Sequence, residues 1–272
     1  MSRKIRVLTL QFNPVIANKQ TNFGKVSELI EKNCWFNPDL VILPEVFNIG
    51  AAHKYFQKMA EEIPNGETSL FLSNLAKKFH TNIIGGSFPE KADNGKYKNT
   101  CCVYDRNGKL VAKYSKIHMF SYYGSKEGDF LESGNEAVIA NLDIGKIGLG
   151  ICYDLRFPEL FRSLVYSGAK IIALPAAWPY PRLEHWTTLS KARAIENLCY
   201  VITSNHCAKT TPSRLNLGHS SIINPWGEII ACAGSEEGVA MAEIDLNFVK
   251  KVREEFRVLE DRNLNAYNNI IL

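Results

Sequence analysis

Short apolar runs alternate with stretches of helical periodicity along this chain. Residues 5–11 and 40–44 are mostly apolar runs of strand length. Between them, Phe23, Val26 and Ile30 recur at the spacing of one helix face. This order predicts a strand, a helix and a second strand, the repeating unit of α/β folds.

The same alternation continues to the end of the chain. It predicts further helices over residues 72–79, 158–165, 184–197 and about 247–256. It predicts further strands over residues 82–88, 146–152, 170–175, 198–204 and 239–244, with hairpins over 100–105 and 110–114 and over 218–231. Because no linker rich in Gly, Ser or Pro interrupts these elements, we expect residues 1–272 to form one α/β domain.

The composition is typical of a globular protein and argues against nucleic acid and membranes as partners. Hydrophobic residues make up 46% and charged residues 22% of the chain, and the net charge of +4 is dispersed. Basic and aromatic residues form no cluster of the kind that binds nucleic acid. Thr9, Gln11 and Asn13 interrupt the first apolar run, and no stretch of about 18 apolar residues follows. We therefore expect a cytoplasmic protein that binds neither nucleic acid nor membranes.

Cofactor motifs are missing from the sequence. The seven cysteines and six histidines show none of the close spacings of zinc ligands. Gly85 and Gly86 follow a predicted strand but lack the rest of a nucleotide-binding fingerprint. We expect no metal and no cofactor, so any chemistry has to come from side chains.

Three reactive side chains occupy the same kind of position. Glu45, Lys116 and Cys152 each lie at or just past the C-terminal end of a predicted strand, the edge where open α/β sheets form ligand crevices. Cys152 ends a strand before a helix, so the Tyr153 N–H of that turn is the natural donor to an oxyanion. The position of Cys152 by itself is also consistent with a buried, unreactive cysteine at the end of a strand.

Three segments together resemble a known family. The sequence reads LPE at residues 43–45, KYSKIH at 113–118 and GICYDLR at 150–156. In this order and spacing the segments resemble the motifs of the nitrilase (carbon–nitrogen hydrolase) superfamily. The resemblance implies an α-β-β-α sandwich, two packed sheets flanked by helices, and a catalytic triad of Glu45, Lys116 and Cys152.

The chemistry that the resemblance implies is hydrolysis of an amide through a thioester. The Cys152 thiol would attack the carbonyl while Glu45 takes its proton and passes it to departing ammonia. Lys116 and the Tyr153 N–H would hold the oxyanion, and water would then cleave the thioester with Glu45 again as base. Because a cation favours a neighbouring thiolate, Lys116 would also activate the nucleophile.

A further glutamate of the family corresponds to Glu127, which lies between the Lys and Cys motifs. Glu127 precedes Gly134 by seven residues, much as the family glutamate precedes a turn of the Pro-Gly kind. It would orient Lys116 and the substrate. Glu132 competes for this role, and Ser133 stands where relatives often carry Pro.

Residues around the nucleophile are expected to support its turn. We expect an ion pair between Arg156 and Glu159, and backbone hydrogen bonds to Asp154. His118 suggests a Cys–His dyad, but the resemblance gives the base role to a glutamate. We therefore place His118 among the supporting residues.

The segment over residues 175–186 is expected to shape the substrate pocket, as similar loops do in the family. A short substrate would be enclosed by aromatic walls, and a cation would meet its carboxylate. The candidate lining residues are Tyr122, Tyr123, Ala177, Trp178 and Arg182, with Arg182 as the carboxylate partner.

Finer features of the motifs favour the amidase branches of the superfamily. The segments CYDLRFPE, GHS and NPWGE resemble amidases that act on small ω-amides, whereas true nitrilases usually follow the nucleophile with Trp-Glu. The resemblance thus implies an omega-amidase acting on 2-oxoglutaramate or succinamate. The alternatives are a deaminated-glutathione amidase, an N-carbamoyl amidohydrolase, a nitrilase, or an inactive binding scaffold.

The resemblance also concerns assembly. Family members commonly form dimers through helices near the nucleophile and through the C-terminal segment. It implies a homodimer or a higher homo-oligomer, with residues from about 247 to 272 in the contacts.

Overall fold

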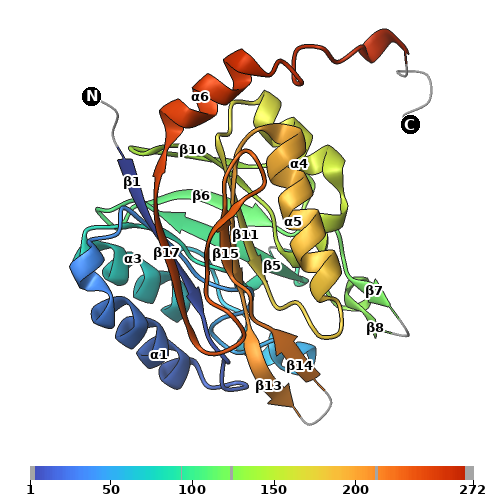
Figure 1. Cartoon of the computed structure of the whole chain (residues 1–272). Coiled ribbons are helices and arrows are strands. Elements are labelled where there is room, and N and C mark those ends of the chain that lie inside the picture. Colours follow the sequence, from blue (N-terminus) through green and yellow to red (C-terminus); the bar gives the residue numbers. More distant parts are fainter. Residues whose placement is uncertain (1–3, 93, 123–124, 212–213, 267–272) are drawn as a thin grey trace.

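Two β-sheets packed face to face form the body of the protein (Figure 1). The computed structural model describes residues 4–92, 94–122, 125–211 and 214–266. Helices cover the outer face of each sheet (Figure 1). The α-β-β-α sandwich expected from the sequence is therefore the observed architecture.

The first sheet has the strand order β17-β1-β2-β3-β5-β4, and β6 also pairs with β5. Strands β1, β2 and β3 run parallel, while their outer neighbours β17 and β5 are antiparallel. The strands are β1 (Lys4–Gln11), β2 (Leu40–Ile42), β3 (Asn82–Ile84), β4 (Phe88–Lys91), β5 (Tyr97–Tyr104), β6 (Leu110–Ser115) and β17 (Gly238–Asp245). Helices α1 (Lys19–Lys32) and α3 (Glu67–Phe79) pack on its outer face.

The second sheet has the strand order β16-β15-β12-β11-β10-β9. Its central strands β10, β11 and β12 run parallel. The strands are β9 (Ile139–Leu142), β10 (Gly145–Leu149), β11 (Ile171–Ala176), β12 (Tyr200–Asn205), β15 (Ser221–Ile223) and β16 (Ile229–Cys232). Helices α4 (Pro158–Tyr166) and α5 (Leu183–Asn197) pack on its outer face.

Alternation along the central strands builds the layers. Val7 and Leu40 are register partners that face the second sheet, while the next pair, Leu8 and Val41, faces α1 and α3. Because successive side chains of a strand point to opposite faces, a strand covered on both sides is apolar throughout. All four side chains are fully buried.

Shorter elements connect the layers. None of the helices in the described ranges combines the length and the apolar character that crossing a membrane requires. The shorter elements are α2 (Phe56–Met59), α6 (Leu246–Glu255), the ribbons β7 (Ser121–Tyr122) with β8 (Ser125–Lys126) and β13 (Cys207–Thr211) with β14 (Arg214–Leu217), and the 3-10 turns η1 (Cys34–Phe36), η2 (His53–Tyr55), η3 (Glu127–Asp129), η4 (Cys152–Arg156) and η5 (Leu264–Ala266).

Two predicted strands differ from the observed ones. The strand predicted over 82–88 is split into β3 and β4, because Gly86 has a φ of +56° and turns the chain. A Cβ on Gly86 would lie 2.0 Å from the Pro44 carbonyl oxygen, so only glycine permits this close approach. The strand predicted over 146–152 ends at Leu149, and Cys152 begins the turn η4.

Candidate active site

Cys152 lies at the corner where β10 turns toward α4. Its φ is +47°, a left-handed backbone conformation that residues other than glycine rarely adopt. Such strain persists where the surroundings hold it, and it is frequent at reactive sites. The turn presents Cys152 at the C-terminal edge of the second sheet, with 9% of the residue exposed.

Asp154 holds this corner together. Its Oδ2 accepts hydrogen bonds from the Ile151 N–H at 2.8 Å and the Tyr114 hydroxyl at 2.7 Å. Its Oδ1 accepts the His118 N–H at 3.0 Å and lies 2.7 Å from His118 Nδ1. The His118 ring stacks on Phe157 with 3.6 Å between centroids. Asp154 therefore ties the segment after β6 to the turn after β10.

Glu45 follows β2 at the same edge of the sandwich. It is 4% exposed, and its Oε1 accepts hydrogen bonds from Lys116 Nζ at 3.1 Å and Asn99 Nδ2 at 2.9 Å. Its Oε2 accepts the N–H of Ala177 at 2.9 Å. Ala177 directly follows β11, so groups from both sheets hold the Glu45 carboxylate.

Lys116 lies between two carboxylates. It is 1% exposed, and its Nζ is 2.8 Å from Glu127 Oε2 in addition to its contact with Glu45. Glu127 Oε2 also accepts the N–H of Phe120 at 2.9 Å. Glu132 instead accepts a hydrogen bond from Asn94. Of the two candidate glutamates, Glu127 is therefore the one that contacts Lys116.

The charges of this cluster act on one another. Burial alone lowers the pKa of Lys116, but the carboxylates of Glu45 and Glu127 raise it well above its usual value. Burial and the Glu45 carboxylate raise the pKa of the Cys152 thiol well above its usual value, although Lys116 lowers it. The expected effect of Lys116 on the thiol is therefore present but is outweighed by burial and by Glu45.

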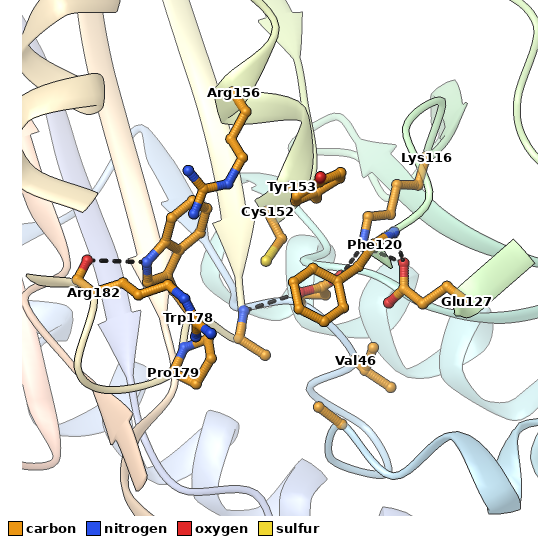
Figure 2. Close-up of a pocket in the computed structure, with 13 residues that line it drawn as sticks. Val46, Lys116, Phe120, Glu127, Cys152, Tyr153, Arg156, Trp178, Pro179 and Arg182 are labelled. Carbon is orange, nitrogen blue, oxygen red and sulfur yellow. Dashed lines mark hydrogen bonds and ion pairs between the residues drawn. The ribbon is translucent and has the colours of Figure 1, made fainter. Parts of the chain in front are cut away.

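A cavity opens beside Cys152, and these residues share it (Figure 2). Its empty volume is about 610 Å³, including the open solvent at its mouth. The lining residues are Glu45, Val46, Ala51, Lys116, Phe120, Glu127, Cys152, Tyr153, Arg156, Ala177, Trp178, Pro179 and Arg182.

The wall opposite Lys116 carries aromatic and cationic groups. Figure 2 shows Cys152 between Lys116 on one side and Arg156, Trp178 and Arg182 on the other. The Arg156 guanidinium lies 4.7 Å from the Trp178 ring centroid. Trp178 Nε1 donates a hydrogen bond to the Arg182 carbonyl oxygen at 3.1 Å. The two arginines thus lie on the opposite side of Cys152 from the cluster of Glu45, Lys116 and Glu127.

Some of the expected positions differ from the observed ones. Arg156 and Glu159, both within the described ranges, form no ion pair: Arg156 Nη2 lies 3.4 Å from His185 Nδ1, and Glu159 is exposed in the first turn of α4. Tyr122 is 49% exposed and stacks beneath the Arg182 guanidinium, at 4.5 Å from its ring centroid. Tyr123 lies outside the described residues.

Several residues of the site were not predicted from the sequence. Asn99 binds Glu45 from the middle of a strand, and nothing in its local pattern distinguishes it from other buried polar residues. Phe120 lies two residues after the Lys motif at 113–118. An aromatic residue so close to that motif could have indicated a place in the pocket. The other unpredicted lining residues are Val46, Ala51 and Pro179.

The residues that the structure describes form no recognisable metal-ion site. Within residues 4–92, 94–122, 125–211 and 214–266, no group of three or more His, Cys, Asp or Glu side chains is arranged to hold a metal ion. Among the described residues, the cations that line the cavity are the side chains of Lys116, Arg156 and Arg182.

The fold agrees with the comparison to known proteins. The chain belongs to the carbon-nitrogen hydrolase family, whose sequence model matches residues 6–254. The expected family and the expected class, a hydrolase of carbon–nitrogen bonds, are therefore confirmed.

Known relatives resemble the chain over nearly its whole length. The omega-amidase NIT2-B of Xenopus laevis is 37% identical, with 97% of this chain and 97% of the relative covered. The 2-oxoglutaramate amidase of Bacillus subtilis (strain 168) is 36% identical, with coverage of 97% and 100%. The crystal structure of Saccharomyces cerevisiae Nit3, a member of branch 10 of the nitrilase superfamily, superposes with a TM-score of 0.87 at 32% identity, covering 94% and 95% of the two chains.

Proposed function

We propose that this protein is an omega-amidase, which hydrolyses the terminal amide of a short carboxylic acid such as 2-oxoglutaramate or succinamate. One observation carries the proposal: the cavity places Cys152 between a Glu and Lys cluster on one side and two guanidinium groups on the other. A substrate with an amide at one end and a carboxylate at the other matches this distribution of charge. The names of the Xenopus laevis and Bacillus subtilis relatives support the same substrate class.

The first half of the reaction forms a thioester. The Cys152 sulfur attacks the amide carbonyl carbon, and Glu45 takes the thiol proton. A base is required because the pKa of the thiol is raised by burial and by Glu45. The oxyanion is stabilised by Lys116 Nζ and the Tyr153 N–H. Glu45 then gives its proton to the nitrogen, the carbon–nitrogen bond breaks, and ammonia leaves.

The second half of the reaction restores the enzyme. Glu45 takes a proton from a water molecule, and the hydroxide attacks the thioester carbonyl. The carbon–sulfur bond breaks, Glu45 returns its proton to the Cys152 sulfur, and the acid product leaves and ionises to the carboxylate. Glu127 holds Lys116 in place through the 2.8 Å contact to its ammonium group. Asp154 and His118 support the corner without joining the reaction.

The carboxylate of the substrate is assigned to the arginine side of the cavity. Arg182 was the sequence-based candidate, and Arg156 lines the same cavity. Both guanidinium groups lie against aromatic rings, a setting that limits their side-chain freedom and lowers the entropy lost on binding.

Ammonia release from matched substrates tests this assignment. Succinamate and 2-oxoglutaramate are compared with neutral amides, nitriles and ureides of equal length. Arg156→Gln and Arg182→Gln are expected to raise KM for the acids by roughly tenfold or more, with little change for neutral amides. Arg257→Gln is the matched control, because Arg257 is exposed and pairs with Glu260. If neutral amides are hydrolysed equally well, the omega-amidase assignment fails and the broader amidase function is kept.

We also propose that the protein acts as a homodimer in the cytoplasm. Exposed apolar side chains on α5, β16 and the residues after α6 support the dimer, since large exposed apolar patches mark interaction surfaces. The chain after α6 extends away from the sandwich (Figure 1), where it is accessible to a second copy. Sedimentation of the purified protein and fractionation of the source cells test the two statements separately.

A further inference from the structure

The proposed base and the proposed nucleophile come from different sheets. Glu45 follows β2 of the first sheet, and Cys152 follows β10 of the second. Each sheet fixes its own residues, but the distance between the two groups depends on contacts that cross from one sheet to the other. Because a misplacement of about 1 Å costs on the order of a hundredfold in rate, such contacts are part of the catalytic geometry.

The peptide group between Glu45 and Val46 is held at both ends by buried side chains. His206 Nε2 lies 2.6 Å from the Glu45 carbonyl oxygen, and since a carbonyl only accepts, Nε2 is the donor. At the other end, the Val46 N–H donates a hydrogen bond to Ser87 Oγ at 3.0 Å. His206 and Ser87 are both fully buried.

This peptide group is strained. Val46 has a φ of +48°, a left-handed conformation that is unfavourable for a β-branched residue. Rotation of the Glu45–Val46 peptide plane would relieve the strain and would move the Glu45 backbone. The hydrogen bonds from His206 and to Ser87 oppose that rotation, because either bond would be lost and its buried partner left unsatisfied.

His206 brings the second sheet to this point. It directly follows β12, and its N–H donates to the Ala176 carbonyl oxygen at 3.2 Å. The same oxygen accepts the Glu45 N–H at 3.4 Å, and the next residue, Ala177, donates to Glu45 Oε2. The backbone and the carboxylate of Glu45 are thus both fixed to the sheet that carries Cys152.

Ser87 is brought to the same peptide from the first sheet. The preceding residue, Gly86, lies so close to Pro44 that a Cβ would meet its carbonyl oxygen at 2.0 Å. This close approach places Ser87 beside Val46. The glycine that splits the predicted strand over 82–88 therefore has a second consequence, which is the position of the Ser87 hydroxyl.

We propose that His206, together with Ser87, is a positioning residue of the amidase reaction. It holds the strained Glu45–Val46 peptide against the second sheet, so that the Glu45 carboxylate meets Cys152. His206 acts through Glu45 and takes no proton from the substrate. The inference rests on the proposed roles of Glu45 and Cys152 in amide hydrolysis.

Four variants test the proposal. His206→Leu removes the donor, His206→Gln keeps one, and Ser87→Ala removes the acceptor at the other end of the peptide. Ser204→Ala is the matched control: Ser204 Oγ donates to the Leu10 carbonyl oxygen at 2.6 Å, another bond between the sheets from the same strand. Each variant is assayed for kcat and KM with succinamate, for the free energy of unfolding in urea, and for the pH midpoint of Cys152 alkylation by iodoacetamide.

His206→Leu is expected to lower kcat by about tenfold or more with KM within about twofold, and Ser87→Ala to lower kcat severalfold. His206→Gln is expected to stay within about threefold of the wild type. The alkylation midpoint is expected to move to lower pH in His206→Leu, the direction in which removal of the Glu45 charge moves it. Ser204→Ala is expected to change stability and leave both readouts unchanged.

The proposal is overturned if His206→Leu folds and keeps the wild-type kcat and midpoint. It is also overturned if Ser204→Ala lowers kcat as much as His206→Leu. If His206→Leu does not fold, Ser87→Ala decides by the same criteria. Failure of the proposed function would look different, since the wild type would then release ammonia from neutral amides as readily as from succinamate, or from no amide at all. The alkylation midpoint needs no turnover and would still test the contact between Glu45 and Cys152.

Discussion

Two neighbouring charges act on the Cys152 thiol in opposite directions. Burial and the Glu45 carboxylate raise its pKa, and the Lys116 ammonium lowers it. The net pKa lies well above the usual value of a thiol, so Cys152 differs from the acidic, permanently ionised cysteines of other enzymes. In the proposed mechanism, attack by Cys152 therefore depends on Glu45 as the base.

The first prediction concerns the titration of this thiol. Glu45→Gln removes a negative charge that disfavours the thiolate, so the pKa of Cys152 is expected to fall. Lys116→Met removes a positive charge that favours the thiolate, so the pKa is expected to rise. The pH midpoint of Cys152 alkylation measures both shifts without turnover, and Cys152→Ala identifies the signal of other cysteines. Equal midpoints in all three proteins would contradict the described charge balance.

The second prediction concerns Lys116 as an oxyanion donor. Lys116→Ala is expected to lower kcat by about a hundredfold or more, the usual effect of removing such a donor. It also leaves the buried carboxylates of Glu45 and Glu127 without their cation, which costs about 3–5 kcal/mol in the free energy of unfolding. Steady-state kinetics and urea unfolding measure the two effects. Exhaustive chelation is expected to leave the wild-type rate unchanged, and loss of activity that zinc restores would contradict the role of Lys116.

At the scale of elements, the turn after β10 depends on a residue that is not a reactant. Asp154 is fully buried and accepts hydrogen bonds from Ile151, Tyr114 and His118. Tyr114 lies on β6 within the Lys motif, so Asp154 joins the end of β6 to the turn after β10. The Lys motif and the Cys motif are therefore connected through this carboxylate.

The third prediction tests that coupling. Tyr114→Phe removes one hydrogen bond to Asp154 and preserves the packing of the ring, so the free energy of unfolding is expected to fall by about 1.5–3 kcal/mol. Urea unfolding measures the change. Tyr180→Phe is the control, because Tyr180 is 62% exposed and its change should stay within about 0.5 kcal/mol. Equal stabilities of Tyr114→Phe and the wild type would show that Asp154 does not depend on this bond.

At the scale of the whole molecule, several apolar side chains on and beside β16 are exposed. Trp226 is 45% exposed and stacks on Phe256, with 6.2 Å between ring centroids. Ile229 and Ile230 on β16 are 42% and 41% exposed. Aromatic and aliphatic groups grouped in this way are enriched in the centres of protein interfaces.

The fourth prediction concerns the proposed homodimer. The wild type is expected to sediment as a dimer, and Ile230→Lys to shift the equilibrium toward the monomer, because a charge buried in an apolar interface has no partner. Trp35→Lys is the control: Trp35 is 72% exposed and lies after α1, on the other layer. Sedimentation velocity of the three proteins decides, and a wild type that sediments as a monomer at every concentration would contradict the proposed assembly.

The sequence by itself determined the elements and the class of protein. Apolar periodicity located the strands and helices because the alternation of side chains along a strand or helix is a local property. Three short motifs in order identified the family, and family membership carried the sandwich fold with it. Glu45, Lys116 and Cys152 were predictable because each stands in a recognisable motif at the end of a strand.

Only the tertiary structure decided which residues meet around these three. His206 and Glu45 are separated by 161 positions in the chain, and no local pattern indicates that they touch. The same holds for Asn99 beside Glu45 and for the choice of Glu127 over Glu132. Such contacts arise where the two sheets pack against each other. Packing depends on how the side chains of whole layers fit together, and not on the spacing of residues within one element.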